Sequence, residues 1–291
     1  MQQEKRLSSD SRLVDRTKSF ARRVLLHATL WIIAIATVYP LIWIFLMSFK
    51  DRFELLAGNS FGLPHKWLFS NYLTAVTSFP LHLYFINSVA YTGITIVATV
   101  LLAGMFSYAV SRMKFRLSSF MYVYITLGLI IPIEVVIVPI FLLEKSIHVL
   151  NTYFSTVLPY IAFNISLCSL LLYAFFRTLP TEIEESACLD GCSIYRVFFQ
   201  IVLPISKSAL STVIIWLYLN VWNEFFIAYI LLIKDSLKTL PLGVLNFISS
   251  RAVDWGPMGA AMIISCIPTL AVYLVFNEQV ERALTAGALL K

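Results

Sequence analysis

Long apolar runs alternate with short polar segments along almost the whole chain. Six runs are long enough to cross a membrane, at roughly 24–49, 84–110, 119–143, 154–176, 208–233 and 258–277. A membrane-crossing helix needs about 20 mostly apolar residues, and in hydrocarbon every backbone N–H and C=O must pair within the segment. The pattern therefore predicts an all-α membrane protein with six transmembrane helices.

Composition agrees with a membrane protein, because 59% of the 291 residues are hydrophobic and only 13% are charged. Soluble chains contain about 45–50% apolar and about 25% charged residues. The first apolar run follows a basic leader and lacks a convincing small-residue cleavage site, so it is expected to be a retained span. We expect a flexible basic leader over 1–23, a six-helix transmembrane domain over 24–277 and a tail over 278–291.

Lysine and arginine predict the orientation. They are concentrated in the leader and in the loops that share its side of the membrane, which places both termini in the cytoplasm. The net charge of +6 is then a consequence of topology. No basic patch is interleaved with exposed aromatic residues, so a nucleic-acid partner is not expected.

Catalytic and metal-binding patterns are missing from the sequence. Cys188 and Cys192 are four residues apart but have no neighbouring histidine, so neither a zinc site nor a disulfide is expected. The chain contains no phosphate-binding loop and no nucleophile elbow. If ATP drives this protein, another chain must bind it.

One polar stretch, Glu182 to Pro204, interrupts the apolar runs on the cytoplasmic side. Thr181 and Glu184 have the spacing of a capping box, Asp190-Gly191 is a turn signal, and a second helix is expected from about Ser193. The stretch thus predicts helix, sharp turn and helix. Two interpretations stay open from the residues alone: a rigid element that fits a groove in a partner, or an amphipathic connector on the lipid headgroups.

The letters EESACLDGCSIYRVFFQIVLP resemble the EAA loop of permease subunits of ATP-binding-cassette (ABC) importers. The matching positions are Glu185, Ala187, Asp190, Gly191, Ile201, Leu203 and Pro204. Ser186 stands where the family has its middle alanine, and Cys192 and Ser208 also differ from the usual residues. The stretches YPLIWIFLMSFK, WNEFFIAYILL and ERALTAGALLK are similar to the shorter, six-span permease of the maltose and multiple-sugar subgroup.

The resemblance implies a type I ABC importer permease fold with a cytoplasmic EAA coupling-helix hairpin at about 178–207. It also implies a bacterial inner membrane, a second homologous permease, a cytoplasmic ATPase dimer that binds ATP and Mg²⁺, an extracellular solute-binding protein and a sugar or oligosaccharide cargo. No cofactor and no catalytic role are expected in this chain itself. The residues expected to couple it to the ATPase are Glu185, Ser186, Ala187, Asp190, Gly191, Phe198, Ile201, Leu203 and Pro204. Of these, Phe198, Ile201 and Leu203 are expected to anchor the hairpin beneath the bundle.

Polar residues within the apolar runs are candidates for a substrate pathway, since ionisable groups inside membrane segments are rare and usually face a bundle interior or water. They are Glu134, Asn164, Asn220, Trp222, Asn223 and Glu224. Asn220, Asn223 and Glu224 share one helical face by their i, i+3, i+4 spacing. Carboxylate, amide and aromatic groups suit a polyol, although the same groups also serve to bond neighbouring helices or the partner permease.

Other readings remain. A second interpretation keeps the same machinery with a polyol phosphate, a nucleoside or a uronic-acid oligomer as cargo. A secondary carrier would need paired buried charges or inverted repeats with broken helices, neither of which is evident. A membrane-embedded enzyme is disfavoured because no His/Asp or metal-ligand cluster occurs.

Overall fold

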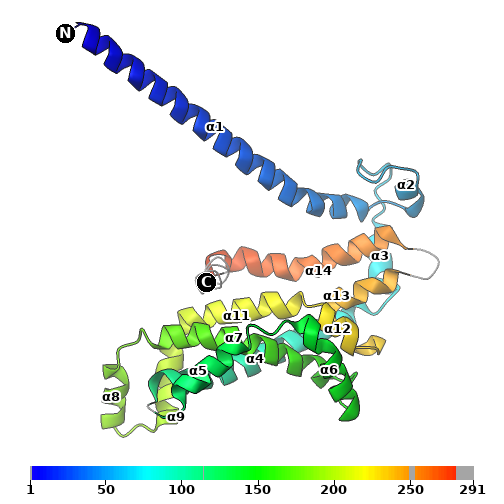
Figure 1. The fold of residues 1–291 in the computed structure, drawn as a ribbon. Helices are drawn as coiled ribbons and strands as arrows, with labels where there is room; N and C mark the ends of the chain where they lie inside the picture. The colour runs from blue at the N-terminus through cyan, green and yellow to red at the C-terminus, as the bar shows by residue number, and fades with distance from the viewer. Residues whose placement is uncertain (1, 114, 249–252, 280–291) are drawn as a thin grey trace. The chain divides into compact units, whose positions relative to one another are not determined.

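The computed structural model describes residues 2–113, 115–248 and 253–279. Within those ranges the regular secondary structure is helical, apart from one isolated bridge between Ile248 and Val253 (Figure 1). The longer helices are α1 (Gln2–Met47), α4 (Leu81–Arg112), α5 (Ser118–Leu127), α6 (Ile133–Ser146), α7 (Tyr153–Phe176), α11 (Lys207–Trp222) and α14 (Trp255–Val275). The shorter ones are α2 (Arg52–Leu56), α3 (Ser70–Thr77), α8 (Glu182–Leu189), α9 (Ile194–Val197), η1 (Phe198–Val202), α10 (Leu203–Ile205), α12 (Phe226–Leu231), η2 (Asp235–Leu237), α13 (Leu240–Gly243) and η3 (Val244–Phe247).

Four of the described helices are long and apolar enough to cross a membrane, at Arg22–Met47, Leu81–Arg112, Tyr153–Phe176 and Trp255–Val275. A fifth crossing results if the bent pair Ile194–Ile205 and Lys207–Trp222 forms one span. An all-α membrane architecture is therefore confirmed at this level. Six crossings stay a prediction.

The run predicted at 119–143 is two helices, α5 and α6, separated at Gly128–Pro132. Pro132 lacks the N–H that a continuous helix would use, and its ring disfavours helical geometry in the residue before it. Helices of 10 and 14 residues are each too short to cross the hydrocarbon alone.

The leader also differs from its expected description, because α1 begins at Gln2 and is one helix through Met47. No glycine and no proline occurs before Pro40, so nothing in the backbone interrupts helical geometry between the charged leader and the apolar run. The expected boundary at residue 23 is thus a change of polarity within one helix.

By contacts the chain divides into two compact units, and the first comprises residues 1–72 and 254–263. In this unit Lys50 holds the loop that follows α1, and its side chain is fully buried. Its ammonium donates to the carbonyl oxygens of Asn59 at 2.7 Å and Gly62 at 2.6 Å. The Asn71 amide donates to the carbonyls of Ser48 and Lys50, both at 2.9 Å. Together these bonds close the loop that follows α1.

The second unit, residues 73–253 and 264–291, is built on the pairing of α4 with α7. Small residues allow the close approach, and the Ser107 hydroxyl donates across the pair to the Ser169 carbonyl at 2.7 Å. Helix α11 packs against both helices. One apolar cluster around Phe176 and Phe198 lies near the α4 C-terminus, and another around Tyr91 and Tyr160 lies towards its N-terminus.

A polar network holds residues 235–246 against the N-terminal end of α4. Tyr84 donates to Asp235 at 2.6 Å, and the buried Asn87 amide donates to the carbonyls of Ser236 and Lys238 at 2.9 and 3.0 Å. Although burial raises it, hydrogen bonds from Tyr84, Lys238 and Asn246 keep the pKa of Asp235 below its usual value. The segment between α12 and α14 is therefore tied to α4 as far as residue 246.

The hairpin α8–α9 lies at the opposite end of α4, α7 and α11 from α12 and α13 (Figure 1). Tyr84 and Tyr108, which mark the two ends of α4, are separated by about 36 Å of helix at 1.5 Å per residue. That span exceeds the roughly 30 Å of bilayer hydrocarbon.

Candidate functional site

The predicted hairpin is present, and its turn is a Schellman motif. Gly191 has φ +79°, its N–H donates to the Cys188 carbonyl at 3.0 Å, and the Cys192 N–H donates to the Ala187 carbonyl at 2.9 Å. This pairing satisfies the last carbonyls of α8, and it requires a residue that tolerates the left-handed region. Ser193 then caps α9 by accepting from the Arg196 N–H at 3.4 Å. The structure thus has a helix, a turn and a short second helix at these residues.

The predicted capping box does not form, since Thr181 has helical φ and ψ and its side chain makes no cap hydrogen bond. Glu184 has other partners instead. Its carboxylate pairs with the Arg112 guanidinium at 3.1 Å and accepts from the Tyr108 hydroxyl at 3.1 Å. Arg112 also donates to the Leu179 carbonyl at 2.5 Å. Glu184 is therefore bonded to side chains of α4, and not to the backbone at the start of α8 as a capping box would require.

Tyr108 contacts both arms of the hairpin. Its hydroxyl bonds Glu184 on α8, and its ring lies 5.2 Å from the Phe198 ring on η1. Tyr108 and Arg112 are one helical turn apart on α4, so the C-terminal end of α4 clamps the hairpin. Sequence reasoning missed both residues, because they lie about 70 positions upstream and Arg112 was considered only as a topology signal.

The hairpin has a buried side and an exposed side. On the buried side Ala187 and Phe198 belong to the apolar cluster, and Ile201 and Leu203 pack against it. At the exposed side lie Glu185, Ser186, Asp190 and Gly191. Two apolar side chains, Leu189 and Tyr195, are 90% and 74% exposed there. These two were not singled out from the sequence, although Leu189 directly precedes the Asp-Gly turn.

The second arm ends in a π-turn and a sharp bend. Residues Phe198–Val202 form the π-turn η1, and the helical segment through Ile205 meets α11 at 80°. Pro204 cannot donate to the Gln200 carbonyl, and a π-turn relieves the clash that its ring would cause in an α-helix. The bend is at Ser206, which is fully buried and whose hydroxyl donates to the Val202 carbonyl at 2.6 Å. We call this bend the elbow.

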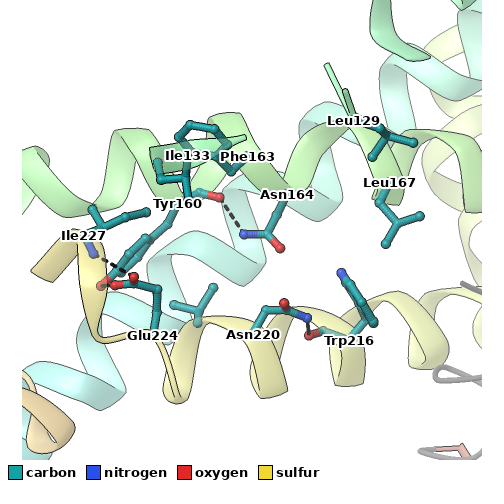
Figure 2. Close-up of a pocket in the computed structure, with 11 residues that line it drawn as sticks. Leu129, Ile133, Tyr160, Phe163, Asn164, Leu167, Trp216, Asn220, Glu224 and Ile227 are labelled. Atoms are coloured by element: carbon teal, nitrogen blue, oxygen red, sulfur yellow. Dashed lines mark hydrogen bonds between the residues drawn. The ribbon is translucent and has the colours of Figure 1, made fainter. Parts of the chain in front are cut away.

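Helix α11 leads from the elbow to a cavity of about 320 Å³ between α7 and α11 (Figure 2). The α7 face contributes Tyr160, Phe163, Asn164 and Leu167, and α11 and its C-terminal end contribute Trp216, Asn220, Val221 and Glu224. Both sets follow helical spacing, so each is one continuous face. Leu129, Ile133 and Ile227 complete the lining at the α5–α6 break and on α12.

Glu224 is held by three donors around the cavity. Its carboxylate accepts from the Ile227 N–H at 2.7 Å, the Ala228 N–H at 3.2 Å and the Tyr160 hydroxyl at 2.8 Å. It thus begins α12 and joins α11 to α7, which is the helix-bonding role left open from the sequence.

Asn164 and Asn220 face each other across the cavity in Figure 2. Each amide nitrogen donates to a carbonyl one turn back in its own helix, Asn164 to Tyr160 at 2.8 Å and Asn220 to Trp216 at 2.9 Å. This fixes each amide plane. Within the described part of the chain, each amide oxygen and the second N–H of each amide have no protein hydrogen-bond partner, so they are available to a ligand.

Three other predicted pathway residues do not line this cavity. Asn223 is exposed and donates to the Leu219 carbonyl at 2.8 Å. Trp222 is buried against the rings of Phe85 and Tyr218, and Glu134 is exposed on α6. The aromatic residues that do line it, Tyr160, Phe163 and Trp216, were not singled out, because aromatic residues are common throughout the apolar runs.

Comparison with known proteins identifies the chain. Residues 100–286 match the family described as binding-protein-dependent transport system inner membrane component. The chain belongs to this family. Permeases of binding-protein-dependent transport are transport components, so the chain is not an enzyme. Among the residues that the structure describes, no three His, Cys, Asp or Glu side chains are grouped to hold a metal ion.

Two relatives and one solved structure show how far the similarity extends. The diacetylchitobiose uptake system permease protein NgcG of Streptomyces coelicolor is 32% identical over 263 residues, covering 90% of this chain and 87% of its own. The sulfoquinovosyl glycerol transport system permease protein SmoH of Agrobacterium fabrum is 29% identical, covering 89% of this chain and 90% of its own. A bacterial ABC transporter involved in import of the acidic polysaccharide alginate matches with TM-score 0.77 and 23% identity, over 88% of this chain and 95% of the other. That last likeness supports the ABC importer permease fold alone.

Proposed function

We propose that this chain is one of two permease subunits of an ATP-driven importer that moves a sugar or oligosaccharide into the cytoplasm. The observation that carries the proposal is one continuous connection: the exposed tip of the hairpin, the elbow and α11, which ends at the cavity. The hairpin is the element on which an ATPase would act, and the cavity is where cargo would pass.

Partners follow from this assignment. A separate ATPase dimer binds ATP and Mg²⁺ and receives the hairpin tip, with Leu189 and Tyr195 as its apolar contacts and Glu185 and Asp190 as its polar ones. A solute-binding protein delivers cargo from the other side, and a second homologous permease completes the pore. The α5–α6 pair acts as one broken span, which gives six crossings and places both termini in the cytoplasm.

A carbohydrate cargo is supported by the relatives, whose names include diacetylchitobiose and sulfoquinovosyl glycerol. These compounds are different, so family membership indicates sugars in general without selecting one. No observation on this chain favours a secondary carrier.

The native Cys188 tests both the orientation and the coupling role, since it is a free, exposed thiol in α8 close to the turn. We would keep Cys188 and replace Cys168, Cys192 and Cys266 by alanine or serine. A membrane-impermeant maleimide is expected to label Cys188 in inside-out vesicles and not in intact cells, and assembly with the ATPase is expected to protect it. Labelling from outside would overturn the orientation, and labelling that the ATPase leaves unchanged would overturn the docking.

Cargo is tested by uptake. In a strain that lacks this chain, a panel of labelled mono- and oligosaccharides is measured with and without rescue by the wild-type protein. We expect one sugar or a small group of sugars to depend on the chain. If none does, the sugar assignment is wrong even where the Cys188 result supports the coupling role.

A further inference from the structure

The cavity between α7 and α11 is lined by two side-chain amides, Asn164 and Asn220, whose hydrogen-bonding groups are only partly used by the protein. Asn164 and Asn220 each use one N–H for a bond within their own helix, which leaves one acceptor and one donor on each amide beside the cavity. A sugar hydroxyl is at once a donor and an acceptor, so it complements an amide of this kind completely. Two such amides on opposite walls would hydrogen-bond two hydroxyls of one sugar ring.

The remaining walls suit the apolar parts of a sugar. Trp216 and Phe163 present aromatic surface, and Leu129, Leu167 and Ile133 add aliphatic surface. A mostly apolar lining with a few fixed polar groups is the usual composition of a small-molecule site. The volume of about 320 Å³ is at the lower end of such sites, which favours one sugar unit at a time over an extended chain.

Charge distinguishes between classes of sugar. Among the described residues that line the cavity none is lysine, arginine or histidine, and the single ionisable acid is Glu224. Its carboxyl group accepts three hydrogen bonds from the protein and is therefore already engaged. An acidic sugar would bring its charge into a medium of low dielectric where no cation compensates it, and an unpaired charge of this kind disfavours binding strongly.

We propose that this cavity binds a neutral sugar ring in transit, with Asn164 and Asn220 as the residues that recognise its hydroxyls and a lining without cations that disfavours acidic sugars. The inference rests on the proposed import of sugars. It goes beyond it by naming the contact residues and the charge class. It also sets this chain apart from the structural relative that imports an acidic polysaccharide.

The test uses the complete complex with its ATPase and second permease, purified in detergent without the solute-binding protein. Binding of tritiated maltose and N,N′-diacetylchitobiose, the neutral probes, is compared with binding of a labelled mannuronate disaccharide. Asn164→Ala and Asn220→Ala are each expected to weaken neutral-sugar binding at least tenfold. Asn223→Ala is the matched control, because Asn223 is tied to its helix in the same way but lies outside the cavity. It is expected to change binding by less than twofold.

Each outcome decides the matter. If the cavity variants bind neutral sugar like the Asn223→Ala control, recognition by the two amides is wrong. If the mannuronate disaccharide binds as tightly as the neutral probes, or neither neutral probe binds the wild type, the assignment of charge class is wrong. Asn164→Gln and Asn220→Gln, which keep an amide but displace it, replace any alanine variant that fails to assemble, with the same expected weakening. Failure of the proposed function is separate, because it would appear as loss of every sugar dependence in the uptake experiment.

Discussion

Gly191 is the residue on which the hairpin turn depends most directly. An added Cβ would meet no atom within 4 Å, so space does not require a glycine, but φ +79° does. Asp190-Gly191 is a local signal, and for that reason the turn was predictable from the sequence. The partners of Glu184 were not, since they come from a helix about 70 residues away.

Replacing Gly191 by valine is expected to strain the left-handed turn by about 1–2 kcal/mol and to reduce ATP-dependent uptake while the protein still reaches the membrane. Asparagine tolerates this region better, so Gly191→Asn should retain most of the activity. Uptake in proteoliposomes, normalised to permease content, measures both. Equal activity of the valine variant and the wild type would show that coupling does not need this turn.

The Arg112–Glu184 pair is expected to position the hairpin. The two side chains are 8% and 18% exposed, so Arg112→Met leaves a largely buried carboxylate without its cation. We expect a loss of roughly 2–3 kcal/mol, somewhat below the cost of a fully buried unpaired charge. The double variant Arg112→Met/Glu184→Leu should recover part of that loss. Thermal unfolding of the four proteins of this cycle measures the coupling, and additive effects would contradict the pairing.

At the scale of elements, breaks within apolar runs were the least predictable features. The run at 119–143 is apolar throughout, and reading its length alone merges α5 with α6 even though Gly128 and Pro132 were visible. Only part of the arrangement of α7 against α11 was predictable from the sequence. Helical spacing grouped Asn220 with Glu224, but spacing within one helix contains no information on which neighbour it meets.

The π-turn η1 offers a test of the elbow. Pro204→Ala restores an N–H that is able to bond the Gln200 carbonyl, so the turn is expected to revert to α-helix and to rotate the residues that follow by about 100°. We expect ATP hydrolysis by the assembled complex to persist while uptake per ATP falls several-fold. Parallel assays of hydrolysis and uptake in proteoliposomes check this. An unchanged ratio would mean that the geometry of the elbow is not used in transport.

At the scale of the whole molecule, the polar network beside the α4 N-terminus is the counterpart of the hairpin at the other end of the helix. Asn87 is its centre, because it donates to two carbonyls and accepts from the Tyr153 hydroxyl at 2.6 Å. The bonds to the Ser236 and Lys238 carbonyls span 149 and 151 residues of sequence and the bond from Tyr153 spans 66, so no local pattern predicted them. They bring the chain that follows α12 back to the start of α4.

Asn87→Leu is expected to leave these groups unpaired, at about 1–3 kcal/mol for each buried group. The melting temperature should fall, and trypsin added from outside should cleave faster at Lys234 and Lys238. Asn223→Ala, at the exposed residue that follows the last residue of α11, serves as the comparison and should behave like the wild type. Unchanged cleavage in Asn87→Leu would show that the segment is held by other contacts.

The elbow makes α11 a lever. About 21 Å of helix separates Ser206 from Asn220 at 1.5 Å per residue, so a rotation of about 10° at the elbow would displace Asn220 by roughly 4 Å. A hydrogen bond near 2.9 Å does not survive such a displacement. In the proposed coupling, a force that the ATPase applies at the hairpin tip therefore need not produce a large movement at the ligand. A small rotation of one helix is enough to open one wall of the cavity and release a bound molecule.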